Sequence, residues 1–316
     1  MNETEQIAEI AHGYFGVYPC KLVRVPTMGT TLIYEIRYPT DKYFLKTTKE
    51  ISSRSIDLAI EAECYKLLNT RGVPCPEVLV LDTSCALLSR VYFLMNRANG
   101  IPLDNLELTF EHHQKLFEKV GVILRSIHSI KLSGFGDIDI DNYQVTGKIE
   151  GYYSSWQEYI QEKAKSNLEI LEKTNLLLLS EIDYIPQILS RFAELEKTTD
   201  KTGLLHGDFT LEHIFVNPKL TRITSIIDLG EVLIGDPIWD FVSLSWNSLQ
   251  ILDYVQIGYG ILDSYRDNFL FKLSIYKVLY ALRVLVWALA QDLSPLSCYV
   301  NRLLDQIQQA KYTLKI

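Results

Sequence analysis

Two short polar motifs between apolar segments contain the side chains of this sequence that are best suited to chemistry. The first is His-Gly-Asp-Phe-Thr-Leu-Glu-His at 206–213, and the second is Ile-Ile-Asp-Leu-Gly at 226–230. Carboxylates in such turns can bind a divalent cation, and they can orient and deprotonate an attacking hydroxyl. We therefore expect Asp208 to be a general base, and Asp228 and His213 to hold Mg²⁺ beside a transferable phosphate.

Each of these side chains also has a structural interpretation. An aspartate after His-Gly is commonly a turn residue, and Asp228 could likewise cap the turn that follows it. The pair of aspartates favours catalysis, because unrelated turns seldom supply both. Asp228 follows an apolar strand, where a bound cation would offset the cost of burying its carboxylate. His206 is expected to be a buried brace whose ring bonds to the backbone.

His213 is an unusual candidate for a magnesium ligand. Mg²⁺ prefers oxygen ligands, so an imidazole changes the field around the ion or moves the ion. A core histidine with a satisfied ring is the alternative. Asn217 precedes Pro218 and is expected in a hairpin turn rather than at the metal. Asp236 and Asp240, in the Gly-Asp-Pro-Ile-Trp-Asp motif, are expected to be scaffold, with Asp236 capping a helix.

The first hundred residues consist mainly of short apolar segments typical of β-strands. The expected strands are Leu22–Val25, Thr31–Tyr38, Tyr43–Thr47, Val78–Leu81 and Val91–Met95. One helix, capped by Ser52 or Ser53, is expected between the third and fourth strands, because Ile56, Ile60 and Leu67 follow a helical period.

Long helical patterns follow Asn99-Gly100, interrupted by short strands around Leu204 and Ile226. The expected helices are 110–127, 153–171, 185–196, 240–252, 269–290 and 299–312. We therefore expect a nucleotide-binding lobe at 1–98, a hinge at about 96–100, and a catalytic and substrate-binding helical lobe at 99–316.

Lys46 lies on the expected third strand, where a lone lysine normally points outward. Glu63 shares a helical face with Ile56, Ile60 and Leu67, so we expect Glu63 to point toward the sheet, where its carboxylate needs a cation. Glu61 is the alternative, with apolar neighbours on its own face. Gly29 and Thr30, in the loop between the first two strands, could cover phosphates with backbone N–H groups and a hydroxyl, although an ordinary hairpin explains this loop equally well.

At these motifs the sequence resembles the aminoglycoside phosphotransferase and choline kinase branch of the kinase-like enzymes. The catalytic stretch of that family reads H-G-D-x-x-x-x-N, and its metal aspartate lies in I-D-x-G. His213 departs from the pattern, in a way that is similar to macrolide phosphotransferases and aminoglycoside 2''-phosphotransferases. The resemblance implies an α+β, bilobal protein-kinase-like fold, with a small five-stranded antiparallel lobe that contains one helix and a larger, mostly helical lobe.

The resemblance also implies the roles of the nucleotide-binding residues. Lys46, held by Glu63, would bind the phosphates of ATP or GTP. Met95 would lie behind the base, and the backbone of Asn96 and Ala98 would be free to bond its edge.

A small-molecule kinase is therefore the implied function, with Mg²⁺ as cofactor and an alcohol as acceptor. The leading acceptor is an aminoglycoside, which would make the enzyme an antibiotic-resistance determinant. Macrolides remain possible because of His213, and metabolites of the choline, homoserine or thioribose type are the other acceptors. A nucleotide-binding pseudokinase that regulates a partner is the alternative of another class.

Composition and charge agree with a cytoplasmic enzyme. The chain has 316 residues and a net charge of −8, which argues against nucleic acid or an acidic membrane as partner and favours a cationic ligand. Five cysteines without a C-x-x-C pair indicate neither a disulfide framework nor a zinc cluster. No secretory signal is evident at the first residues, and the apolar stretch 278–290 is too short to span a bilayer. We expect a monomer or a dimer.

Overall fold

The computed structural model describes residues 2–27, 31–49, 55–107, 113–174, 176, 182–196, 202–246, 250–261 and 266–315. The chain forms two compact units that do not coincide with two continuous segments. The first unit comprises Met1–Thr109, Ile140–Gly147 and Leu211–Glu231, and the second comprises Phe110–Asp139, Lys148–Thr210 and Val232–Ile316. The single boundary expected near residues 96–100 stays a prediction.

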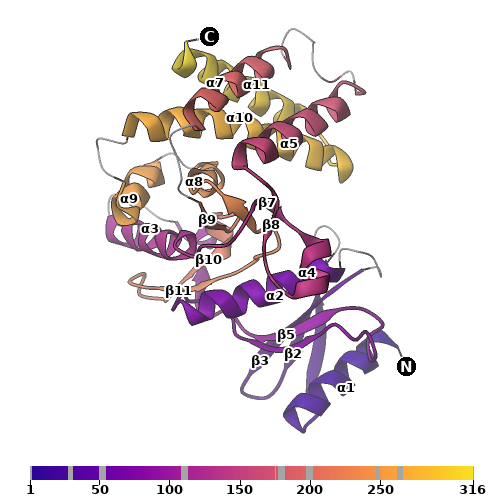
Figure 1. Ribbon diagram of the computed structural model, residues 1–316. Helices are drawn as coiled ribbons and strands as arrows, with labels where there is room; N and C mark the ends of the chain where they lie inside the picture. Colours follow the sequence, from indigo (N-terminus) through magenta and orange to yellow (C-terminus); the bar gives the residue numbers. More distant parts are fainter. Residues whose placement is uncertain are drawn as a thin grey trace. The chain divides into compact units, whose positions relative to one another are not determined.

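The first unit is built on a five-stranded antiparallel sheet (Figure 1). Its strands are β1 (Lys21–Val25), β2 (Thr31–Arg37), β3 (Lys42–Thr48), β4 (Val78–Asp82) and β5 (Tyr92–Asn96), in the order β1-β2-β3-β5-β4. All five expected strands are confirmed to within two residues at each end. Alternating polarity made them visible, since β2 buries every second residue.

Two helices cover this sheet on opposite faces (Figure 1). Helix α1 (Glu3–Phe15) packs Ile7 and Ile10 into a core with Leu45 of β3. The next residue, Lys46, points to the other face, where α2 (Ser55–Thr70) lies. The sequence-based interpretation missed α1, whose start is a capping box between Asn2 and Glu5. The expected caps of α2, Ser52 and Ser53, lie outside the described residues.

A second, three-stranded sheet completes the first unit, in the order β11-β10-β6. It joins β6 (Ile101–Pro102) to β10 (Ile214–Val216) and β11 (Ile223–Ile226), with the short helices η1 (Leu103–Asn105) and η2 (Leu211–His213) and helix α4 (Ile140–Thr146) in the same unit. The β10–β11 turn contains Asn217, whose Oδ1 accepts from the N–H groups of Thr221 and Arg222 at 2.8 and 2.9 Å. The hairpin role expected of Asn217 is confirmed.

The second unit is mostly helical around one small sheet. Its helices are α3 (Gln114–His128), α5 (Trp156–Leu171), α7 (Tyr184–Glu196), α8 (Ile238–Ser245), α9 (Gln250–Tyr259), α10 (Arg266–Ala290) and α11 (Ser297–Leu314). The sheet has the order β8-β7-β12-β9, with strands Gly151–Tyr153, Phe135–Ile138, Leu233–Gly235 and Gly203–Leu205. The single helix expected over 240–252 is wrong, because α8 ends at Ser245 and α9 begins at Gln250.

Helix α10 is long and apolar enough, by length and composition, to cross a membrane. The window Asp267–Ala290 has a mean hydropathy of 1.6, and 56% of it is buried inside the structure. It also contains Lys272, which is buried in an ion pair with Asp236. A core helix meets the same criteria, so we interpret α10 as the central helix of the second unit.

Candidate active site

In the first unit, Lys46 joins two carboxylates that are distant in the sequence. Its Nζ lies 2.8 Å from Oε1 of Glu61 on α2 and 3.1 Å from Oδ1 of Asp228, just after β11. The side chains of Lys46 and Glu61 are almost completely buried, whereas that of Asp228 is 48% exposed. Burial alone would lower the pKa of Lys46. The charges of Glu61 and Asp228 raise this pKa by more than burial lowers it, so the net shift is upward and the ammonium stays charged.

The choice of Glu63 as the partner of Lys46 is wrong. Glu63 instead forms an exposed ion pair with Lys66, one turn along α2, with 2.7 Å between Nζ and Oε1. Helix α2 buries residues on most of its circumference, including Leu58, Ile60 and Cys64. The helical period therefore could not identify the face that meets β3.

Asp228 is held in an uncommon backbone conformation. Its φ is +63°, in the left-handed region that aspartate tolerates better than most residues. Its backbone N–H donates to the hydroxyl of Tyr65 on α2 at 2.7 Å. Tyr65 is buried, and burial raises its pKa, so the phenol remains neutral. Sequence reasoning did not identify this contact.

His213 lies beside Asp228. It ends η2, its side chain is 12% exposed, and its Nε2 is 3.6 Å from Oδ2 of Asp228, which is longer than a hydrogen bond. Within the described ranges, no group of three His, Cys, Asp or Glu side chains could hold a metal. One half-exposed carboxylate nevertheless fits Mg²⁺, which takes one or two protein carboxylates and completes its shell with phosphates and water. The metal-binding roles of Asp228 and His213 stay predictions.

The expected nucleotide-binding segments are only partly described. Gly29 and Thr30 lie outside the described residues. Met95 is half-buried and ends β5 together with Asn96, and half-buried Ala98 follows. The backbone of Asn96 is not free as expected, because its N–H donates to the carbonyl of Glu77 at 3.1 Å. Whether Met95, Asn96 and Ala98 contact a base stays a prediction.

In the second unit, the backbone at 206–208 is clamped by a buried carboxylate. Asp240 on α8 accepts from the N–H of His206 at 2.7 Å and from the N–H of Gly207 at 2.8 Å. His128 of α3 lies 2.9 Å from Oδ2 of the same carboxylate. His206 is buried, and its Nδ1 accepts weakly from the Asp208 N–H at 3.4 Å. The scaffold role of Asp240 and the bracing role of His206 are confirmed.

The side chain of Asp208 extends from this clamped loop toward α10. The hydroxyl of Tyr280 donates to Oδ1 of Asp208 at 3.1 Å, and Nη1 of Arg283 is 3.5 Å from the carbonyl oxygen of Gly207. Tyr280 is buried between the rings of Trp239 and Trp246. Sequence reasoning missed Tyr280, because a tyrosine in an apolar helix is usually a core residue. The catalytic role of Asp208 stays a prediction.

The start of α8 is anchored by a second buried network. Asp236 accepts from the N–H of Ile238 at 3.0 Å. The expected N-cap role of Asp236 is wrong, because α8 begins at Ile238 and Pro237 is its N-cap residue. The other carboxylate oxygen of Asp236 accepts from Lys272 at 2.7 Å and from Tyr276 at 2.9 Å, both on α10. Trp156 of α5 donates to the Tyr276 hydroxyl at 2.8 Å. These contacts fix α8, and with it Asp240, to α10 and α5.

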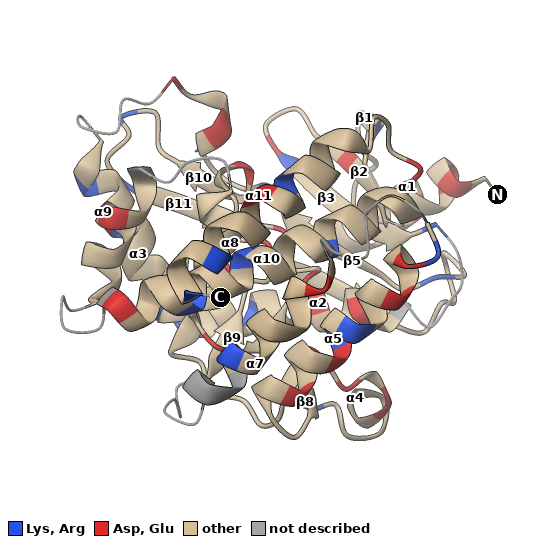
Figure 2. Ribbon diagram, turned by 90° about the horizontal axis from the view of Figure 1, so that it is seen from above, with Lys and Arg blue, Asp and Glu red and all other residues tan. Residues whose placement is uncertain are grey.

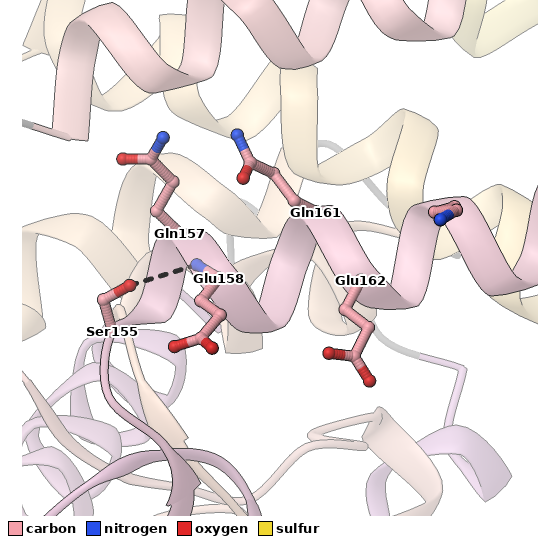
Figure 3. A pocket seen from close by; sticks show the side chains of 6 residues that line it. Ser155, Gln157, Glu158, Gln161 and Glu162 are labelled. Carbon is pink, nitrogen blue, oxygen red and sulfur yellow. Dashed lines mark hydrogen bonds between the residues drawn. The ribbon is translucent and has the colours of Figure 1, made fainter.

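A separate polar depression lies along α5 (Figure 3). Ser155 caps the helix through the Glu158 N–H at 3.1 Å, and the side chains of Gln157, Gln161, Glu162 and Lys165 complete the lining. Acidic and basic residues are interspersed along the same helix in Figure 2. Its lining does not include Asp208 or its neighbours on α10, and we assign it no role in catalysis.

Comparisons with known proteins identify the family of the chain. The sequence profile of the phosphotransferase enzyme family matches residues 30–268. Acyl-CoA dehydrogenase family member 10 of Mus musculus is 25% identical over 225 residues, which cover 69% of this chain and 19% of that protein. Family member 11 of Homo sapiens is 20% identical over 189 residues, covering 58% and 22%. The chain thus spans about a fifth of the length of these relatives.

Solved structures of aminoglycoside phosphotransferases have the same fold. APH(4)-Ia superposes with a TM-score of 0.70 at 16% identity, over 99% of this chain and 98% of the other. The GDP and kanamycin complex of APH(2'')-IIIa gives a TM-score of 0.68 at 16% identity, over 98% of both chains. The kinase-like α+β fold is therefore confirmed. Because the family profile covers most of the chain, the protein belongs to the phosphotransferase enzyme family, and its expected class, a small-molecule O-kinase, is confirmed.

Proposed function

We propose that this chain transfers the γ-phosphate of ATP or GTP to a hydroxyl of a small molecule. The observation that carries this proposal is the buried Lys46, bridged between Glu61 and the half-exposed Asp228. A charged lysine fixed by one buried carboxylate can contact phosphate oxygens without losing its position. Solved relatives hold ADP, AMP-PNP and GDP, which supports a nucleotide as donor.

Asp208 would orient the acceptor hydroxyl and take its proton. The acceptor oxygen forms a bond to the γ-phosphorus as the bond from that phosphorus to the bridging oxygen breaks, and the nucleoside diphosphate leaves with the electron pair. Tyr280 holds one oxygen of Asp208 through its hydrogen bond, which restricts the rotation of the carboxylate. Such fixed orientation is a large part of catalysis when little covalent chemistry falls to the protein.

Mg²⁺ is the metal we propose, with Asp228 as its carboxylate ligand and His213 beside it. When bound, the ion would neutralise charge on the transferred phosphate. Lys46 contacts Oδ1 of Asp228, and because the side chain is half-exposed, a metal could reach its carboxylate from solvent.

The acceptor is proposed from the relatives and from the resemblance. Solved aminoglycoside phosphotransferases hold hygromycin B or kanamycin, so an aminoglycoside is a candidate. The relatives with the higher sequence identity are named as acyl-CoA dehydrogenase family members, which favours a metabolite instead. Macrolides and alcohols of the choline, homoserine or thioribose type complete the candidates.

Nucleotide turnover tests the proposal most directly. We expect Mg²⁺-dependent release of ADP or GDP that is stimulated by the correct acceptor and is lost in Asp208→Asn. The acceptor screen should contain aminoglycosides, macrolides, primary-alcohol metabolites and hydroxylated acyl-CoA thioesters. Nucleotide binding without Asp208-dependent turnover would instead favour the pseudokinase.

A further inference from the structure

The acidic stretch 206–240 gives only limited support to a cationic acceptor, because half of its carboxylates already contact basic side chains within the protein. Asp228 is paired with Lys46 at 3.1 Å, Asp236 with Lys272 at 2.7 Å, and Asp240 lies 2.9 Å from His128. These are three of the six acidic residues of the stretch. Asp236 and Asp240 are buried in these contacts and are therefore not available to attract an amine-bearing ligand.

Two side chains of α10, Tyr280 and Arg283, contact the loop that carries Asp208 within the second unit. The Arg283 guanidinium contacts the carbonyl of Gly207, next to Asp208, and lies 5.9 Å from the ring centroid of Tyr280. The Tyr280 hydroxyl in turn contacts Asp208. A cation, Arg283, therefore contacts the residue directly before the expected base.

A second cation lies on the same aromatic cluster. Trp246, after α8, packs its ring 5.0 Å from that of Tyr280. The guanidinium of Arg302, from α11, lies over the other ring of this pair, 4.4 Å from the Trp246 centroid. Arg302 is exposed and Trp246 is partly exposed, so a ligand can reach both. The cluster Tyr280, Trp246, Arg283 and Arg302 thus combines an aromatic surface with two positive charges.

Lys277 adds a third cation one helical turn before Tyr280 on α10. It is half-buried, and burial lowers its pKa. A nearby anion would oppose this effect and stabilise the ammonium. Helix α10 therefore presents basic residues on both sides of Tyr280, since Lys277 precedes it by three positions and Arg283 follows it by three.

We propose that the acceptor carries an anionic oxygen group, a carboxylate or a phosphate, that binds Arg283 while the acceptor hydroxyl faces Asp208. The inference rests on the proposed phosphotransferase function and names the substrate class of that function. A guanidinium has five N–H donors in a fixed fork that matches two oxygens of a carboxylate or a phosphate, so Arg283 has the geometry to bind an oxyanion. Trp246 and Tyr280 would form the apolar wall beside this group.

Three probes with the same carbon chain and different charge test the proposal. Gluconate, gluconamide and glucamine carry a carboxylate, a neutral amide and an ammonium at one end, and sorbitol 6-phosphate separates phosphate from carboxylate. Binding to the enzyme saturated with a non-hydrolysable nucleotide is measured by titration calorimetry, and phosphate transfer is measured in parallel. We expect an anionic probe to bind at least about tenfold more tightly than glucamine, because hydrogen bonds to charged groups are the stronger ones.

The variant Arg283→Gln should weaken the anionic probe by about ten- to a hundredfold and change glucamine by less than threefold. Arg125→Gln is the matched control, because Arg125 also contacts a backbone carbonyl, that of Tyr259 at 3.4 Å, but away from Asp208. Arg125→Gln should leave the affinities for both the anionic probe and glucamine unchanged. Far-ultraviolet circular dichroism and the melting temperature establish that both variants are folded.

Two results would overturn the inference. The first is tighter binding of glucamine than of either anion. The second is an equal loss for all probes in Arg283→Gln, which would make Arg283 a brace for the Gly207 loop. The proposed function fails separately: if nucleotide turnover with every acceptor is independent of Asp208, the chain is not the proposed kinase, whatever charge it prefers to bind. Transfer to kanamycin without any response to Arg283→Gln would keep the function and reject the anionic acceptor.

Discussion

Asp228 in the first unit and Asp240 in the second both follow apolar segments, yet the protein holds them in opposite ways. The Asp228 side chain is 48% exposed and contacts the ammonium of Lys46, whereas Asp240 is completely buried and accepts from two backbone N–H groups. The exposed carboxylate can exchange a contact for a ligand. The buried one can only set the shape of the loop that presents Asp208. Charge near a site therefore does not by itself identify a ligand-binding residue.

The largest effect on activity should come from replacing Asp208, which lies on the loop that Asp240 holds. Asp208→Asn removes proton transfer but leaves the contacts of the loop, so kcat should fall by about 10² to 10⁴ while nucleotide affinity stays unchanged. Steady-state kinetics and nucleotide titration measure the two quantities. A kcat within threefold of the parent would remove Asp208 from the mechanism.

Replacing Asp240, the carboxylate that holds this loop, should reduce the stability of the protein. Asp240→Asn places an amide against backbone N–H donors and removes the charge beside His128, at a cost of about 3 to 5 kcal/mol in unfolding free energy. Urea denaturation at neutral pH measures this loss. The matched control is Asp305→Asn on α11, an exposed position where a change within about 0.5 kcal/mol is expected.

The pH dependence of stability in the parent and in Asp240→Asn gives a further test of the role of Asp240. Burial alone would raise the pKa of Asp240, but the hydrogen bond and charge of His128 and the charge of His206 lower it below its ordinary 3.8. A depressed folded pKa stabilises the protein above the unfolded pKa, and this contribution disappears as pH falls through the folded value. The stability gap between parent and Asp240→Asn should therefore narrow as the pH is lowered below about 4. A gap that is constant with pH would contradict the assignment.

In the first unit, the matched pair Glu61→Gln and Glu63→Gln tests the corrected partner of Lys46. Glu61→Gln leaves a buried ammonium with one carboxylate fewer, so the KM for the nucleotide should rise by about tenfold. Glu63→Gln removes only an exposed pair, which typically contributes little, and should be nearly silent. The reverse ranking would contradict the role of Glu61 in nucleotide binding.

A smaller effect is expected from Tyr280→Phe. It removes the hydrogen bond to Asp208 while keeping the ring between Trp239 and Trp246, so kcat should fall by about three- to tenfold. The KM for the nucleotide should not change, because Lys46 and Glu61 are untouched. If KM rises and kcat stays constant, Tyr280 does not orient the base.

His213→Asn should have the smallest effect with Mg²⁺. The variant restores the residue usual in the family, so activity with Mg²⁺ should be within about threefold of the parent, while Mn²⁺, which tolerates nitrogen ligands, should favour the parent. Activity against metal concentration with each ion decides this. Identical metal dependence in both proteins would return His213 to a structural role.

Local patterns in the sequence predicted the strands and helices well, because alternation and helical period are local properties. These patterns failed for residues whose role depends on a contact with a distant part of the chain. Glu61 and Glu63 differ by two positions on a helix that is buried on most sides, so only the position of β3 distinguishes them. Tyr280 contacts a residue 72 positions away, and nothing near it in the sequence indicates this contact. The motifs around Asp208 and Asp228 were visible because catalytic residue types recur there at short spacing.

The first unit is assembled from three separate stretches of the chain, and this has a consequence for how the protein is made. Lys46 and Asp228 are 182 positions apart, so a ribosome must synthesise most of the chain before the ion pair can form. Until then β6 also lacks its partner β10. An expressed fragment that ends near residue 100 would lack β10, β11 and Asp228. We expect such a fragment to be degraded or to aggregate in cells, and chaperones to be most needed late in translation.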